Sequence, residues 1–285
     1  MKKKLIKFKQ KILLKINKNI FKLFLSPYLA VLFLLIFLPS LLILIYSIIS
    51  FNVNSSVFEI NFKNFIVFFS NLNFLKTLFF SIGLALLASF FAAIISYPIA
   101  YILAFFKSKI IKNNIYFIIS LPIWINMLLK VIGLQTIFNL LSFHHNYLIG
   151  TWYSIVIAMT YMFLPFAILP IYNSLNKINK NYINASYDLG ANKFKTFWKI
   201  TFRSSISGII IAITLVIIQA STSLIVVKYF GAGKINLISK IIESYFFQGT
   251  NFGFGATISI VLIFFILIIL GINKLINSKF EIKQK

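Results

Sequence analysis

The side chains that could carry acid-base, nucleophilic or metal chemistry are few in this 285-residue chain. It has four acids, Glu59, Asp188, Glu243 and Glu281, two histidines and no cysteine. The acids stand far apart, and two adjacent histidines do not make a metal site without further ligands. The segment Gly231-Ala-Gly233 is typical of a turn and lacks the pattern of a phosphate-binding loop. The sequence therefore predicts no catalytic centre, no metal and no ATP site in this chain.

The most conspicuous polar stretch lies between residues 177 and 205. Its first part has helical spacing, and its second part repeats that spacing after Gly190 and Asn192. Gly190 is expected to end the first helix in a left-handed conformation, and Asn192 to cap the second. Small residues at 185 and 186 would let another backbone come close, so the first helix is predicted to carry a docking face of Tyr182, Ala185, Ser186 and Leu189.

The second helix carries an aromatic stripe opposed by lysines. Phe194, Phe197, Trp198 and Thr201 share one side, and Lys193, Lys195 and Lys199 share the other. This pattern suits a helix in the membrane interface, which would leave the first helix to project away from the membrane.

Composition indicates the environment in which this stretch must work. Hydrophobic residues make up 60% of the chain, aromatic residues 18% and charged residues only 11%. These values exclude a water-soluble fold and predict an integral membrane protein. The net charge of +24 would suggest nucleic acid as a partner for a soluble domain, but no basic block faces one here, so no nucleic acid is expected.

Six membrane spans can be placed at stretches that are nearly free of charged residues, each with the length needed to cross a bilayer. They are predicted at 27–49, between 76 and 107, after 112, between 150 and 177, at 204–227 and at 253–273. A basic amphipathic tail, 1–25, precedes a transmembrane domain, 26–275, and a basic tail, 276–285, follows it. The alternate segments outside these spans hold 22 of the 28 basic residues, so both termini and the 177–205 loop are predicted to be cytoplasmic.

Polar or aromatic side chains within the apolar segments are the remaining candidates for a functional role. Tyr97 and Tyr101 flank Pro98, which is expected to bend the second span. Trp124, Asn126 and Lys130 open the third span, where a polar group needs a partner or a water-filled path. Snorkelling to the interface is the alternative explanation of Lys130.

The 184–209 stretch resembles the "EAA" loop of ABC importer permeases. In that loop the sequence Glu-Ala-Ala is followed by three residues of any type and then by Gly. Ala185, Asp188, Leu189 and Gly190 match it, whereas Asn184 replaces the Glu and Ser186 the second Ala. The resemblance implies an all-α fold of the type I ABC importer permease and a coupling helix that inserts into a cytoplasmic ATPase. The residues of this coupling site would be Asn184, Ala185, Ser186, Asp188, Leu189 and Gly190. Because Asn184 replaces the acidic Glu, one ion pair with the ATPase is put in doubt.

Three further segments resemble the polyamine permeases of that family: Leu121-Pro-Ile-Trp-Ile-Asn126, Leu164-Pro-Phe-Ala-Ile-Leu-Pro170 and Asn251-Phe-Gly-Phe-Gly255. This resemblance covers roughly residues 25 to 285. It implies import of spermidine or putrescine by alternating access, with a second permease, two ATPase subunits that carry ATP and Mg, and an extracytoplasmic binding protein. A polycation could be guided by several weak cation-π and amide contacts, for which Tyr97, Tyr101, Trp124 and Asn126 are candidates.

Several alternatives remain open. Those four residues could instead be packing residues or interfacial anchors. Glu243, the only acid of the third outer loop, could meet an arriving cation or be a solvated surface charge. The substrate could be sulfate, molybdate, iron or a phosphonate. A self-sufficient transporter or channel would be expected to carry ionisable residues within its spans, and a purely structural membrane protein would leave the Gly190 loop unexplained.

Overall fold

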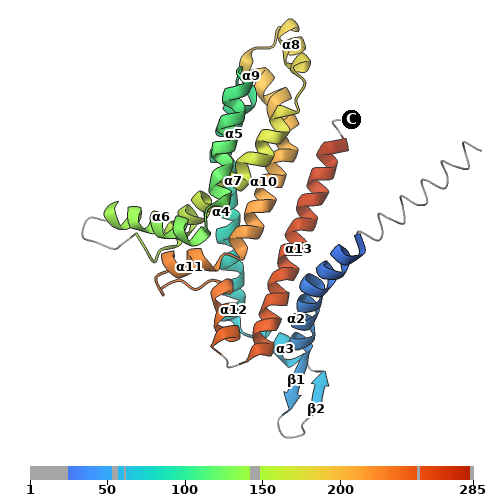
Figure 1. Ribbon diagram of the computed structural model, residues 1–285, viewed down its shortest axis with the longest axis vertical. Coiled ribbons are helices and arrows are strands. Elements are labelled where there is room, and N and C mark those ends of the chain that lie inside the picture. The colour runs from blue at the N-terminus through green and yellow to red at the C-terminus, as the bar shows by residue number, and fades with distance from the viewer. Residues whose placement is uncertain (1–24, 53–56, 61, 142–147, 249–250, 283–285) are drawn as a thin grey trace, which may run out of the picture.

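The computed structural model describes residues 25–52, 57–60, 62–141, 148–248 and 251–282 (Figure 1). The basic tail 1–24 and the pair His144-His145 lie outside these described residues. The chain is nearly all helical, which confirms the predicted fold class. The described residues also include one small hairpin, in which β1 (Ile49–Asn52) pairs antiparallel with β2 (Val57–Ile60). Ile, Phe and Val are good strand formers at these positions.

Within the described ranges, five helices are long and apolar enough to cross a membrane, and a bent pair can supply a sixth crossing. The first is Leu25–Ile48, which contains η1 (Phe33–Phe37) and α2 (Leu38–Ile48). It is followed by α3 (Lys63–Ser70), α4 (Leu72–Phe105), the bent pair α5 (Lys109–Trp124) and α6 (Met127–Leu141), and α7 (Trp152–Asn176). The remaining elements are α8 (Lys180–Asp188), α9 (Lys193–Thr196), η2 (Phe197–Phe202), α10 (Arg203–Ser221), α11 (Leu224–Phe230), α12 (Ile238–Phe247) and α13 (Phe252–Ile282).

Two predicted spans differ from those observed. The third, expected to be one helix after residue 112, is broken by a bend of 96° between α5 and α6. The fifth, expected at 204–227, ends at Ser221, because Ser223 has an extended backbone and α11 starts a separate helix. At its other end this span continues without a break from α9, so that Lys193–Ser221 is one long helix.

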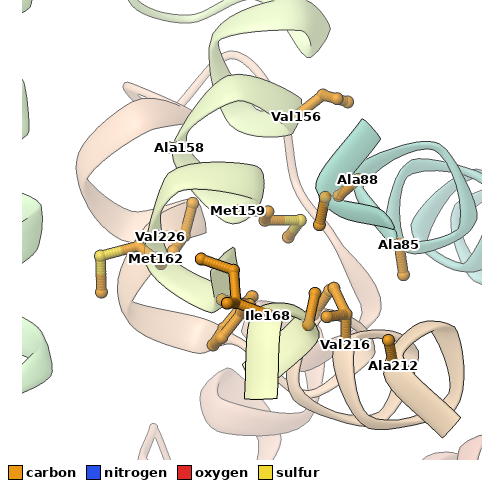
Figure 2. Packing of buried hydrophobic residues seen from close by; sticks show 14 of the residues in the cluster. Ala85, Ala88, Val156, Ala158, Met159, Met162, Ile168, Ala212, Val216 and Val226 are labelled. Atoms are coloured by element: carbon orange, nitrogen blue, oxygen red, sulfur yellow. The ribbon is translucent and has the colours of Figure 1, made fainter. Parts of the chain in front are cut away.

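The core of the bundle is formed by α4, α7 and α10, which pack through small side chains (Figure 2). Ala85 and Ala88 of α4, Ala158 of α7 and Ala212 of α10 are all fully buried. Small residues let helix backbones approach closely, which is how helices associate in a bilayer that offers little hydrophobic driving force.

A second cluster joins α3, α4, α12 and α13 around Phe68, Leu78, Ile238 and Ile258. The first helix packs mainly on α13, where the Thr257 hydroxyl donates to the carbonyl of Ser47 at 3.3 Å. Figure 1 shows α8 and α9 at one end of the molecule and α11, α12 and the hairpin toward the other, with α6 projecting to one side between them. These two groups of elements are called below the loop end and the outer end.

Candidate functional site

The loop end is built around a sharp reversal at Gly190. The backbone there has φ of +78°, which confirms the predicted left-handed conformation. The amide of Ala191 donates to the carbonyl of Ser186 at 3.0 Å, and the amide of Gly190 to that of Tyr187 at 2.9 Å. This pair of hydrogen bonds is a Schellman motif, which satisfies the last carbonyls of α8 and turns the chain back.

Asparagine side chains cap the two helices of this loop. Asn179 Oδ1 accepts a hydrogen bond from the amide of Asn181 at the start of α8, and Asn192 Oδ1 accepts one from the amide of Lys195 at 2.8 Å. The predicted cap at Asn192 is therefore confirmed. Since each amide group satisfies a helix donor that would otherwise have no partner, the orientation of both helices is set by local chemistry.

The predicted docking face divides into an exposed part and a buried part. Tyr182, Ala185 and Leu189 of this face are exposed, and 88% of the Leu189 surface is accessible. The coupling residues Asn184 and Asp188 beside it are exposed as well. Ser186 is buried instead, and its hydroxyl lies 2.7 Å from that of Thr196. The prediction that Ser186 would admit a close neighbour holds, but the observed neighbour is the chain's own α9. Ser186 joins the two helices of the loop and does not form part of their outer surface.

Aromatic rings connect the loop to the bundle. Tyr97 and Tyr101 of α4 contact the ring of Phe197 in η2 edge to face, at centroid distances of 6.0 and 5.6 Å. The hydroxyls of Tyr97 and Ser205 form a hydrogen bond of 3.1 Å. These contacts account for both tyrosines as packing residues that tie α4 to the start of α10.

The crossing of α7 and α10 lies directly behind the loop and depends on Gly208. A methyl group on Gly208 would come within 2.5 Å of Ser174 Cβ and 2.8 Å of the Pro170 carbonyl oxygen. Beside this crossing is a polar groove of about 920 Å³, lined by the basic side chains Lys177, Lys199 and Arg203. Glycine is required here for close approach and not for an unusual backbone angle.

Lys112, which no motif in the sequence indicated, contacts three helices at the loop end. Lys112 Nζ donates to the carbonyl of Ala104 at 2.9 Å and to Asn176 Oδ1, and it lies 5.4 Å from the centre of the Tyr172 ring. It therefore links the end of α4, the start of α5 and the end of α7. Its place in the short charged segment 107–112 was the only signal in the sequence.

The bend between α5 and α6 accounts for two of the polar residues of the third span. Asn126 Oδ1 accepts a hydrogen bond from the amide of Leu128 at 2.8 Å, as a cap of α6 does. Lys130 Nζ donates to the carbonyl of Pro122 at 3.0 Å. That carbonyl belongs to the last turn of α5, where no helical donor follows it. Lys130 therefore forms a hydrogen bond across the bend. This contact differs from the snorkelling to the membrane interface that was the alternative explanation of Lys130.

The four candidate path residues do not come together. Tyr97 and Tyr101 lie near η2, whereas Trp124 and Asn126 lie at the far end of α5, whose 16 residues extend roughly 24 Å. Trp124 is 84% exposed in this chain, so its ring is free to contact lipid, a partner subunit or a solute. Among the described residues, no group of three or more metal-ligating side chains occurs.

Comparison with known proteins places this geometry among transport proteins. Residues 96–282 match the family described as "Binding-protein-dependent transport system inner membrane component". The spermidine/putrescine transport system permease protein PotB of Escherichia coli is 28% identical over 266 residues, which cover 88% of this chain and 96% of that protein. A PotB homolog of Mycoplasma genitalium is 34% identical over 145 residues, 48% of this chain and 50% of that protein.

Solved structures agree on the fold. The structure of a bacterial ABC transporter involved in the import of the acidic polysaccharide alginate contains a chain similar to this one, with a TM-score of 0.69 and 17% identity. The match covers 94% of this chain and 98% of that one. At this identity the similarity concerns the arrangement of helices alone.

Proposed function

This chain belongs to the family of binding-protein-dependent transport system inner membrane components, and from that premise we propose that it imports polyamines such as spermidine or putrescine. It is a permease subunit of an ABC importer and a multi-pass protein of the bacterial inner membrane. The observation that carries the polyamine assignment is the similarity to PotB along 88% of the chain. A permease for sulfate, molybdate, iron or a phosphonate is the alternative.

In the proposed assembly the loop end meets the ATPase. A second, similar permease and two ATPase subunits complete the transporter, and a solute-binding protein delivers the substrate at the outer end. ATP and Mg would bind to the ATPase. Asn184, Ala185, Asp188, Leu189 and Gly190 form the outer surface and pivot of the coupling helix α8. The exposure of Leu189 supports this role, since an apolar tip suits insertion into a groove.

Motion of α8 has two routes into the bundle. One runs from η2 through the rings of Tyr97 and Tyr101 into α4. The other runs along the continuous helix Lys193–Ser221 to the Gly208 crossing with α7. Both end in the core of α4, α7 and α10, so closure of the ATPase would move the helices that alternate the opening between the two sides. Trp124 and Asn126 remain our candidates for substrate contact in that path.

The orientation follows from charge. The loop end carries the basic segments 107–112 and 177–203, and α13 ends toward the same side (Figure 1). The positive-inside rule then puts this end and both termini in the cytoplasm. Because the chain lacks cysteine, single cysteines at Lys193 and Lys234 can test this directly. They should react with an impermeant thiol reagent from opposite faces; labelling of both from the outside would contradict the orientation.

The substrate is tested by reconstitution in proteoliposomes with the cognate ATPase and binding protein. Radiolabelled spermidine or putrescine should accumulate in an ATP-dependent manner, and sulfate, molybdate, iron and phosphonates should not. Accumulation of an anion instead would overturn the polyamine assignment and leave the family unaffected. Trp124→Leu and Asn126→Leu should slow polyamine uptake more than they weaken docking of the binding protein; unchanged uptake in both would remove these residues from the path.

A further inference from the structure

A cavity of about 640 Å³ opens toward the outer end, between the first helix, the junction of α10 and α11, α12 and α13. Most of its wall is apolar, and Ile43 and Ile263 are typical of it. Its polar groups include Thr222, Ser239 and a single carboxylate, Glu243. A mostly apolar cavity with a few convergent polar groups is the usual form of a small-molecule site.

One face of α12 supplies the groups that could recognise a ligand. Ser239, Glu243 and Phe247 follow one another at intervals of four residues, which places them in one row along the helix. All three line the cavity. Across it, Phe252 of α13 adds another ring. The row thus combines a hydroxyl, a carboxylate and an aromatic ring within three helical turns.

The carboxylate of Glu243 has no cation of its own. Although the chain carries 28 basic residues, Glu243 forms no ion pair within the part of the chain that the structure describes. Lys240 precedes it by three residues on α12 and does not pair with it. Glu243 is partly buried beside apolar walls. A carboxylate in such surroundings attracts a cation more strongly than one in water.

The end of α10 adds a further feature that suits a cation. The cavity reaches Thr222 at the C-terminal end of the 19-residue helix α10, where the helix dipole is negative.

We propose that this cavity is a binding site for a primary ammonium group of the transported polyamine, with Glu243 as its counter-charge and the rings of Phe247 and Phe252 as its walls. The proposal rests on the proposed polyamine function and names a site for it at the outer end. Cation-π contact supplements the ion pair. The apolar methylene chain of a polyamine can pack against the apolar wall. Sulfate and molybdate have no apolar part and could not do so.

Uptake by the complete reconstituted transporter tests the role of the charge. At saturating loaded binding protein, Glu243→Gln should lower the rate of spermidine uptake about tenfold, as expected for loss of one charge-assisted contact. Glu243→Asp should restore part of the rate. Lys240→Gln is the matched control, because it changes a charge on the same helix outside the cavity, and it should not lower uptake.

If the wild type carries spermidine and Glu243→Gln carries it equally well, the site is refuted and the proposed function stands. If the wild type carries no polyamine, the proposed function itself fails.

Protection of single cysteines tests occupancy and does not depend on a stable Glu243 variant. In the cysteine-free chain, Ser239→Cys lies in the cavity, whereas Ser244→Cys lies on the same helix outside its lining. Spermidine should slow the reaction of a cationic thiol reagent with Ser239→Cys at least about fivefold, and sodium chloride of equal ionic strength should not. The reaction at Ser244→Cys should not change. No protection of Ser239→Cys at a spermidine concentration that supports uptake would overturn the proposal.

Discussion

The Gly190 loop and the α5 to α6 bend both interrupt the helical bundle, but a neutral hydroxyl pair crosses the loop whereas a lysine crosses the bend. The loop is held by residues close in sequence: a Schellman motif at Gly190 and two asparagine caps. The bend is held in part by a hydrogen bond from Lys130 to the carbonyl of Pro122, eight residues earlier. Both interruptions thus combine local caps with one side-chain bond between consecutive helices, from Ser186 to Thr196 in the loop and from Lys130 to the carbonyl of Pro122 at the 96° bend.

The difference also concerns what each interruption exposes. The loop presents α8 with Leu189 at its tip, on a support fixed by Gly208 and by the Tyr97 and Tyr101 rings. The bend presents Trp124 at the junction of two helices. The first arrangement suits rigid transmission of force from a partner, and the second suits a contact that changes during transport.

The largest effect is expected where the loop enters the bundle. Gly208→Val should destabilise the protein by about 3 kcal/mol or more, because its Cβ would overlap Ser174 and the Pro170 backbone at the α7 to α10 crossing. The measurement is thermal unfolding of the purified protein in detergent. Gly271→Ala is the control, since nothing lies within 4 Å of the added methyl; equal stability of the two variants would contradict the close crossing.

A smaller and more local effect is expected at the pivot of the loop. Gly190→Val should cost about 1 to 2 kcal/mol, because a β-branched residue is disfavoured at a φ of +78° although no neighbour blocks the side chain. ATPase copurification and uptake should fall about five- to thirty-fold, with insertion in the membrane preserved. Gly190→Asn should retain most of both, because asparagine tolerates the left-handed region. Normal uptake by Gly190→Val at normal membrane levels would exclude Gly190 as the pivot.

The bend should respond to loss of its cross-helix hydrogen bond. Lys130→Met keeps the length of the side chain but leaves the Pro122 carbonyl without its donor, which should cost about 1 kcal/mol. Thermal unfolding should begin about 2 °C lower. Lys228→Met on α11, where the lysine is exposed, is the matched control and should have no effect. An unchanged unfolding temperature for Lys130→Met would mean that Asn126 and packing suffice to hold the bend.

These contrasts explain which features the sequence could predict. The membrane class, the left-handed Gly190 and the Asn192 cap depend on composition or on residues within one helical turn, and all three predictions are confirmed. The bend after Trp124 was missed, because apolar composition continues through it and its stabilising contact with Lys130 is not local.

Other features depended on contacts between distant segments. Nothing in the local pattern of Ser186 indicated that Thr196 would bury it. Tyr97 and Tyr101 were grouped with Trp124 by residue type, although they lie at different depths in the bundle. Glu243 was noticed as an isolated acid, but only the fold brings Thr222 and Phe252 to the same cavity.

The smallest effect should separate order within the loop from binding to its partner. Ser186→Ala removes the hydroxyl that bonds to Thr196 and should cost about 1 kcal/mol of local stability, because Thr196 is left buried without that partner. Amides 190–196 should then exchange with solvent roughly fivefold faster. Asn184→Ala, at an exposed position two residues earlier, should leave exchange unchanged and weaken only ATPase copurification. In a double-mutant cycle, Ser186→Ala and Thr196→Val should be non-additive by about 0.5 to 1 kcal/mol. Additive effects would show that Ser186 acts on the outer surface of α8 after all.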